Sequence, residues 1–200
     1  MNKLHPIYVG LSCLLILLNT GCQRTGNSSQ SAEGAAVYKQ LADQRINLPN
    51  GWSLTPAGRT LPLGDFPMNA VVSPDKKYLA VTHGGVSAQT ITLVDIATEK
   101  VLDAAPIAKA WVGLRFSADS RTLYASGGND NLVAIYRVAN DKLTRDGEIK
   151  FGDPWPKNKI SVAGIELDAK RNLLYAVTKE DSALYVCDLA QRKVLSKTKL

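Results

Sequence analysis

The chain has 200 residues, of which 45% are hydrophobic and 21% are charged, and its formal net charge is +6. This is the composition of a globular protein, and it excludes an intrinsically disordered chain and a multi-span membrane protein. The Lys and Arg residues are scattered through the turns and form no run or stripe. The positive charge therefore predicts no nucleic-acid partner.

Residues 1–21 are predicted to form a bacterial export signal. Lys3 precedes an apolar run over residues 11–18, which is too short for a permanent transmembrane helix. The pair Gly21-Cys22 resembles a lipobox, although Asn19 stands where that pattern usually has Leu. We expect Cys22 to carry a lipid that anchors the mature protein in the cell envelope, facing the periplasm or the cell exterior. A plain secretory signal is the alternative.

Residues 22–57 are predicted to be a tether and linker. The stretch from Gln23 to Ala32 is too polar to bury a core. Val37 and Leu41 have the spacing of one helical face and predict a short helix over Ala35–Arg45. The prolines between Leu54 and Leu63 favour an extended segment of the kind found at a sheet edge.

The rest of the chain repeats two short sequences in step. Ser73–Val81 returns as Ser117–Ala125 and, more loosely, as Asp168–Ala176, at spacings of 44 and 51 residues. A second repeat, at spacings of 42 and 51 residues, follows each copy and comprises Ile96–Val101, Val138–Leu143 and Leu189–Val194. A period of roughly 40 to 50 residues with several short strands in each period indicates β-propeller blades.

The predicted fold is all-β, a partial β-propeller over residues 58–200 with four antiparallel strands in each of three blades. The blades are expected at about 65–107, 109–151 and 155–200. The predicted strands are 68–72, 78–82, 90–96 and 101–107, then 111–116, 122–126, 132–138 and 143–151, then 161–167, 173–177, 183–189 and 194 onward. Gly113 and Gly164 suit inner strands, where side-chain volume is limited near the axis.

Three blades do not close a ring, because stable propellers use roughly four to eight. We therefore expect the chain to be the N-terminal part of a longer protein, with Arg59–Leu63 completing the last blade. A short protein that self-associates to cover its open faces is the alternative.

Three segments resemble the Leu-Tyr-Val-Thr-Asn signature of YVTN-type seven-bladed propellers: Leu79–His83, Leu123–Gly127 and Leu174–Thr178. The resemblance covers about residues 58–200, and the terminal Asn of the signature is replaced in all three. Asn50–Arg59, Gly127–Asn131 and Pro154–Pro156 are similar to exported bacterial proteins in which such a propeller precedes an alkaline-phosphatase-like phosphoesterase domain. The resemblance implies that any such domain lies beyond Leu200.

The residues themselves predict no catalytic set, no metal site and no cofactor. His83 stands alone beside Gly84-Gly85 and is expected in a loop, and Cys187 is expected to be a buried apolar residue. The segment Gly127–Asn131 lacks the ligand spacing of a Ca²⁺ loop and is expected to be a turn.

The loops that enter the inner strands and those that join the second strand to the third should share one face. The candidate ligand-binding residues on that face are Asn69, His83, Trp111, Asn129, Asp130 and Trp155. The alternative is that the two tryptophans pack between blades and the charges only solvate the rim. We expect a module that binds or scaffolds a protein or small-molecule partner. A hydrolase, either a propeller lactonase or the phosphoesterase, is the alternative.

Overall fold

The computed structural model describes residues 39, 45–55 and 60–200. The predicted signal, Cys22 and most of the tether lie outside these residues. Of the helix expected over Ala35–Arg45, only Lys39, which is helical, and Arg45, which is not, are described. No helix in the described part of the chain is long and apolar enough to cross a membrane.

The chain divides into two compact units, residues 1–60 and 61–200. The first unit contains a short antiparallel hairpin within the segment assigned to the linker, formed by β1 (Ile46–Asn47) and β2 (Ser53–Leu54). Gly51, at a φ of 80°, supplies the left-handed conformation that its turn requires.

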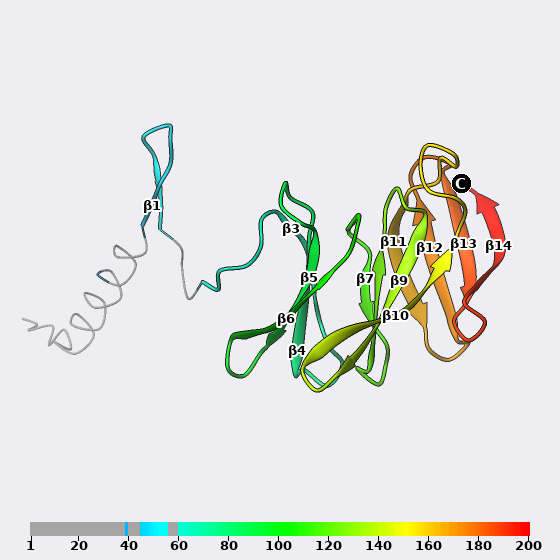
Figure 1. Ribbon diagram of the computed structural model, residues 1–200, viewed down its shortest axis with the longest axis horizontal. Coiled ribbons are helices and arrows are strands. Elements are labelled where there is room, and N and C mark those ends of the chain that lie inside the picture. Colours follow the sequence, from blue (N-terminus) through cyan, green and yellow to red (C-terminus); the bar gives the residue numbers. More distant parts are fainter. Residues whose placement is uncertain (1–38, 40–44, 56–59) are drawn as a thin grey trace, which may run out of the picture. The chain divides into compact units, whose positions relative to one another are not determined.

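The second unit consists of three four-stranded antiparallel sheets, in each of which neighbouring strands follow one another along the chain (Figure 1). Blade one comprises β3 (Pro67–Val72), β4 (Tyr78–His83), β5 (Thr90–Asp95) and β6 (Lys100–Pro106). Blade two comprises β7 (Leu114–Phe116), β8 (Thr122–Ser126), β9 (Leu132–Ala139) and β10 (Lys142–Lys150). Blade three comprises β11 (Val162–Asp168), β12 (Leu173–Thr178), β13 (Ala183–Asp188) and β14 (Lys193–Lys199). The prediction of an all-β fold with four-stranded antiparallel blades is confirmed.

One inner strand is shorter than predicted, and the extended segment ahead of blade one forms no strand within its described residues. β7 begins at Leu114 instead of Trp111, because the Trp111 amide donates to the Ser126 carbonyl in a loop contact ahead of the ladder. Residues 60–63 form no strand. Pairing of Arg59–Leu63 with a later blade stays a prediction.

The repeated Ser-x-Asp sequence is a turn held by its own side chains. In blade one, the Ser73 hydroxyl donates to Asp75 Oδ1 at 2.5 Å and accepts from the Tyr78 amide at 2.9 Å. The bond from Ser73, followed by that from the Lys77 amide, holds the pKa of Asp75 below its usual value. Ser117 and Asp119 form the same turn in blade two. Such local side-chain bonds explain why the sequence predicts these turns well.

Two apolar layers hold the blades together, and blade two lies between them (Figure 1). The first layer packs Ile91 and Leu93 of blade one against Leu123 and Tyr136 of blade two. The second packs blade two against blade three and comprises mainly Tyr124, Val133, Ile135, Ile149, Leu174, Ala176, Tyr185 and Cys187. Because both of its faces are buried, blade two depends on its neighbours for stability.

Cys187 is fully buried in the second layer, which confirms its prediction as a small core residue. Burial raises the pKa of its thiol to about 12. The thiolate form, which is the reactive one, is therefore scarce at neutral pH.

Polar contacts join the rims of adjacent blades. Asp141, in the β9–β10 turn, accepts from Lys77 at 2.8 Å and from the Tyr78 hydroxyl at 2.6 Å in blade one. Arg192, at the same repeat position in blade three, pairs with Asp146 of blade two at 2.8 Å. Each outer turn thus contacts the blade before it.

Candidate binding face

The loops that lead into blades two and three meet the β8–β9 loop. The Trp155 amide donates to the Asn129 carbonyl at 2.8 Å, and the Val162 amide donates to the Gly128 carbonyl at 3.1 Å. Gly128 has a φ of 48°, and a Cβ at this position would collide with the indole of Trp111. We call the surface formed by residues 108–113, 127–131 and 152–161 the loop face.

Asn131 fixes the longest of these loops. Its side chain is 0% exposed, and Nδ2 donates to the carbonyls of Asp153 at 2.6 Å and Asn158 at 2.8 Å. Its Oδ1 accepts from the Ser161 amide at 2.8 Å. One buried amide therefore holds residues 153–161 at three points, and hydrogen bonds to buried polar groups are costly to remove.

Two further amides support the same loop. Asn129 Oδ1 accepts from the Ser161 hydroxyl at 2.7 Å, and Asn158 Oδ1 accepts from the Asp153 amide at 2.7 Å. Each side chain satisfies a polar group in a segment that has no strand partner of its own. The loop is thus pre-organised by side-chain hydrogen bonds, most of which are made to its backbone.

Gln89 plays the corresponding part in blade one. Gln89 and Asn131 precede the second repeat by the same interval. Gln89 Oε1 accepts from the Ala110 amide at 2.5 Å, in the connection that leads to blade two. An amide side chain at the start of the third strand therefore fixes the connection to the next blade in both cases.

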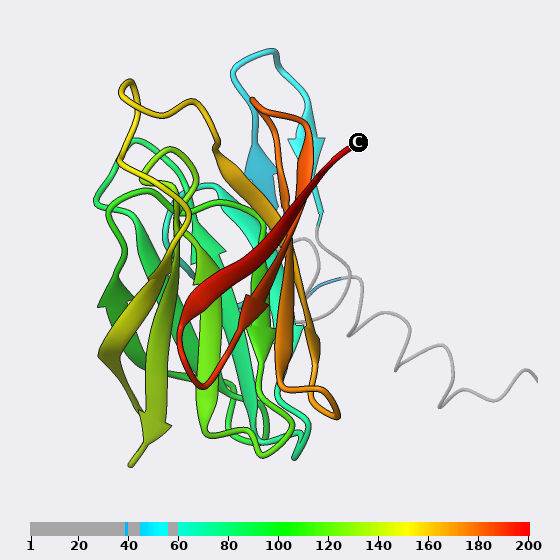
Figure 2. The same cartoon turned by 90° about the vertical axis from the view of Figure 1, so that its right-hand side faces the viewer.

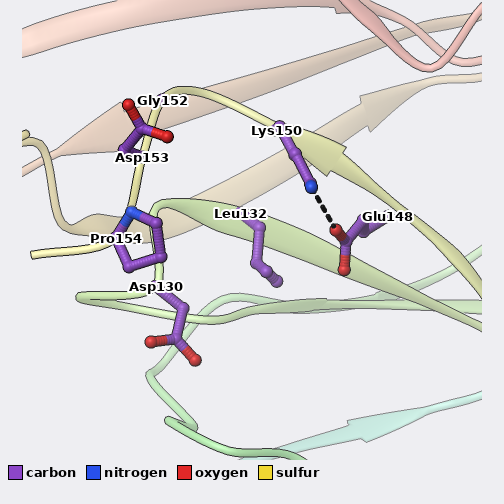
Figure 3. A pocket seen from close by; sticks show the side chains of 7 residues that line it. All are labelled: Asp130, Leu132, Glu148, Lys150, Gly152, Asp153 and Pro154. Carbon is purple, nitrogen blue, oxygen red and sulfur yellow. Dashed lines mark ion pairs between the residues drawn. The ribbon is translucent and has the colours of Figure 1, made fainter.

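A cavity of about 260 Å³ opens beside the pinned loop (Figure 3). Leu132 and Pro154 supply apolar wall, and the other lining residues are Asp130, Glu148, Lys150, Gly152 and Asp153. The three carboxylates each have a cationic partner: Lys109 for Asp130, Lys157 for Asp153, and Arg145 and Lys150 for Glu148. The hydrogen bond that Lys157 donates to Asp153 raises the pKa of the Lys157 ammonium group. The cavity thus has apolar wall beside paired charges, which suits recognition of a polar, mixed-charge segment.

The structure brings together four of the six candidate ligand-binding residues. Trp111, Asn129, Asp130 and Trp155 all belong to the loop face. Trp111 is half-buried against Gly128, so packing accounts for most of its contacts. The Trp155 side chain is 37% exposed, with Lys159 Nζ 5.2 Å from its ring centroid, and a cis peptide bond joins Trp155 to Pro156. Trp155 is therefore the more exposed of the two tryptophans on this face, and a partner can reach it.

The other two candidate residues are not part of the loop face, although Asn69 contacts it. Asn69 donates through Nδ2 to the Val112 carbonyl at 2.6 Å, so it bridges blades one and two. The prediction that His83 lies in a loop is wrong. His83 is the last residue of β4, pairs with Pro67 and Thr90, and is 1% exposed. The strand ladder continues one residue further than the Gly84-Gly85 turn signal indicates, which places the imidazole inside the protein.

Sequence reasoning missed Asn131 as a functional residue and read it only as part of a turn. Its equivalence with Gln89 was available as a signal, since both carry an amide at the same repeat position. The partners of Asn131 lie 22 to 30 residues away along the chain, and no short motif marks them. Within the described residues, no group of three or more His, Cys, Asp or Glu side chains could hold a metal ion.

Comparisons with known proteins identify the fold. No family model matches the chain, and no curated protein matches it. The solved structures that resemble it include hydrazine synthase of Kuenenia stuttgartiensis, with 20% identity and a TM-score of 0.54, covering 67% of this chain and 36% of that one. They also include the WD40 repeats of RRP9, with 14% identity and a TM-score of 0.57, covering 70% and 40%.

A third similar structure is the periplasmic gluconolactonase of Pseudomonas aeruginosa, with 18% identity and a TM-score of 0.52, covering 66% of this chain and 40% of that one. At these identities the likeness concerns the fold alone, and the fold is that of a β-propeller. The chain spans less than half the length of each of these solved structures.

Proposed function

We propose that this protein is an exported, lipid-anchored β-propeller that binds a protein partner through its loop face. The observation that carries the proposal is the position of Trp155 on a loop pinned by the buried side chain of Asn131. Binding to a loop that is already ordered costs less conformational entropy than binding to a loop that must become ordered in the complex. Exposed Trp residues are over-represented among the residues that contribute most to protein–protein affinity.

A protein partner fits the loop face better than a small molecule does. Its charged groups are spread over several loops and occur as ion pairs, as at the polar rims of protein interfaces. The adjoining cavity is smaller than most sites that enclose a drug-sized ligand, which occupy roughly 300 to 1,000 Å³. A side chain of the partner could enter the cavity while the rest of the interface covers Trp155.

Photocrosslinking in the cell that makes the protein tests this proposal and also captures the partner for identification. A benzophenone amino acid placed at position 155 should form a covalent adduct with one protein species. The matched control is position 52, because Trp52 is also exposed but lies in the β1–β2 hairpin. Adducts of equal yield from both positions, or from neither, would contradict the proposal.

The hydrolase alternative has its own readout. If the described blades carried the chemistry, the 200-residue protein would hydrolyse a lactone or a phosphomonoester, and Asp130→Asn would abolish that turnover. The YVTN-type assignment and a phosphoesterase domain remain proposals based on the sequence resemblance. In a phosphoesterase of that arrangement, the propeller would bind and the second domain would catalyse.

Lipid anchoring is tested by Cys22→Ala, which should release the protein from the membrane fraction into the soluble fraction. We expect this release because the lipid on the Cys22 thiol would be what attaches the protein to the bilayer. Cys13→Ala is the matched control, since Cys13 lies within the predicted signal that is removed. Mass spectrometry of the wild-type protein that finds an unmodified N-terminus at any other residue would refute the anchor.

A further inference from the structure

Another cavity, of about 370 Å³, lies between blades two and three at the end of the blades opposite the loop face. Figure 2 shows both ends of blade three, with the loop over residues 152–161 in yellow at the top and the β11–β12 and β13–β14 turns at the bottom. The cavity lining includes Asp119, Thr122 and Tyr124 of blade two and Leu167, Asn172 and Leu189 of blade three. The volume lies within the range of roughly 300 to 1,000 Å³ that encloses small ligands.

The corresponding turns of blades one and two are joined by side-chain hydrogen bonds. The Tyr78 hydroxyl of blade one donates to Asp141 of blade two at 2.6 Å. The Ser120 hydroxyl of blade two accepts from the Asp75 amide of blade one at 3.1 Å. Two cross-blade contacts therefore hold these turns together at the first junction.

The second junction carries different residues at both positions. By the repeat spacings of 44 and 51 residues, Thr122 stands in blade two where blade one has Tyr78, and Arg171 stands in blade three where blade two has Ser120. The threonine side chain is too short to reach across the junction as the tyrosine does. Arg171 instead donates to Asp168 of its own turn at 2.9 Å. The cavity thus occupies the place where the first junction has its two cross-blade contacts.

Tyr124 adds a hydroxyl group that the protein leaves unused. Four described tyrosines are no more than 9% exposed: Tyr78, Tyr124, Tyr136 and Tyr185. The other three donate to Asp141, to the Pro106 carbonyl and to Asp181. The Tyr124 hydroxyl makes no hydrogen bond to another described residue, although buried tyrosine hydroxyls usually have a partner. Burial raises the pKa of Tyr124, so its hydroxyl stays protonated and can donate to a ligand in the cavity.

The charge of the cavity selects against anions. Asp119 is the one ionisable acid in its lining, and no Lys, Arg or His side chain lines it within the described residues. Hydrogen bonds from the Ser117 hydroxyl and the Arg121 amide to Oδ1 hold the pKa of Asp119 below its usual value. Asp119 is therefore ionised at neutral pH, with Oδ2 left to accept from a ligand. Leu167 and Leu189 supply apolar wall beside it.

We propose that this cavity binds a neutral sugar, with the Tyr124 hydroxyl donating to it and Asp119 and Asn172 binding its hydroxyl groups. A sugar ring carries hydroxyl groups around its edge and apolar C–H groups on its faces, which matches polar groups placed beside two leucines. The Asp119 carboxylate favours hydroxyl donors and repels acidic sugars. The site is separate from the loop face, so its occupation does not depend on the proposed protein partner.

Saturation-transfer NMR of the 200-residue protein with glucose and with N-acetylglucosamine tests the proposal. Saturation should pass from the wild-type protein to at least one of these sugars. Tyr124→Phe removes the hydroxyl and keeps the ring in the core, and it should weaken binding by roughly two- to tenfold. Tyr175→Phe is the matched control, since Tyr175 lies at the repeat position of Tyr124 in blade three but does not line this cavity. The control should bind as the wild-type protein does.

Two further comparisons identify the site and the class of ligand. Thr122→Tyr introduces the side chain found at the first junction, so it should fill the cavity and abolish binding. Glucuronate, a sugar with a carboxylate, should bind more weakly than glucose because it faces Asp119. Absence of saturation transfer to both neutral sugars would overturn the proposal, as would tighter binding of glucuronate. Equal affinity of Tyr124→Phe and the wild-type protein would also overturn it, and this comparison decides the matter if Thr122→Tyr does not fold.

Discussion

Replacing Asn131 with alanine should lower the free energy of unfolding of the blade unit by about 3 kcal/mol, because three hydrogen bonds are lost and their backbone partners stay away from solvent. The substitution leaves the Asp153 and Asn158 carbonyls and the Ser161 amide without this side chain. For a unit of this size, the loss corresponds to a fall in melting temperature of roughly 6 to 12 °C. Circular dichroism in a thermal scan measures it.

The matched control is Gln191→Ala, in the exposed β13–β14 turn, which removes an amide from the surface. It should change the free energy of unfolding by less than about 0.5 kcal/mol. If the Asn131→Ala variant has the same melting temperature as the wild-type protein, the loop is not held by this side chain. The pre-organisation on which the proposed binding depends would then be absent.

The sequence predicted the blades because their information is local or periodic. The turn at Ser73-Pro-Asp75 is stabilised within six residues, and the same pattern recurs at Ser117. Alternating apolar residues in the central strands then form the layers between blades. Repetition added a check, because each strand of one copy could be compared with the others.

The loop face was predictable only in part. Trp111, Asn129, Asp130 and Trp155 were found because loop position within the repeat determines which side of the blade they occupy. The bonds of Asn131 to residues 153–161 were not, since they cross from one blade to the connection leading to the next. His83 was misplaced for a similar reason, because its strand partners Pro67 and Thr90 extend the ladder past the point where the glycines suggested a turn.

Replacing Trp155 with alanine should weaken the affinity of the propeller for its partner by about 2 kcal/mol, or roughly 30-fold, if Trp155 is a central contact residue. The side chain is partly exposed, and the backbone bond from its amide to the Asn129 carbonyl is retained in the variant. The loss should therefore appear in binding with little change in melting temperature. The variant keeps Asn131 and its three hydrogen bonds, so the loop itself stays in place.

Titration calorimetry with the protein captured at position 155 tests the binding role of the loop face most directly. The wild-type protein and the Trp52→Ala control should bind with the same dissociation constant, since Trp52 lies in the β1–β2 hairpin. The Trp155→Ala variant should bind roughly 30-fold more weakly. Equal affinity of the Trp155 variant and the wild-type protein would contradict a binding role for the loop face.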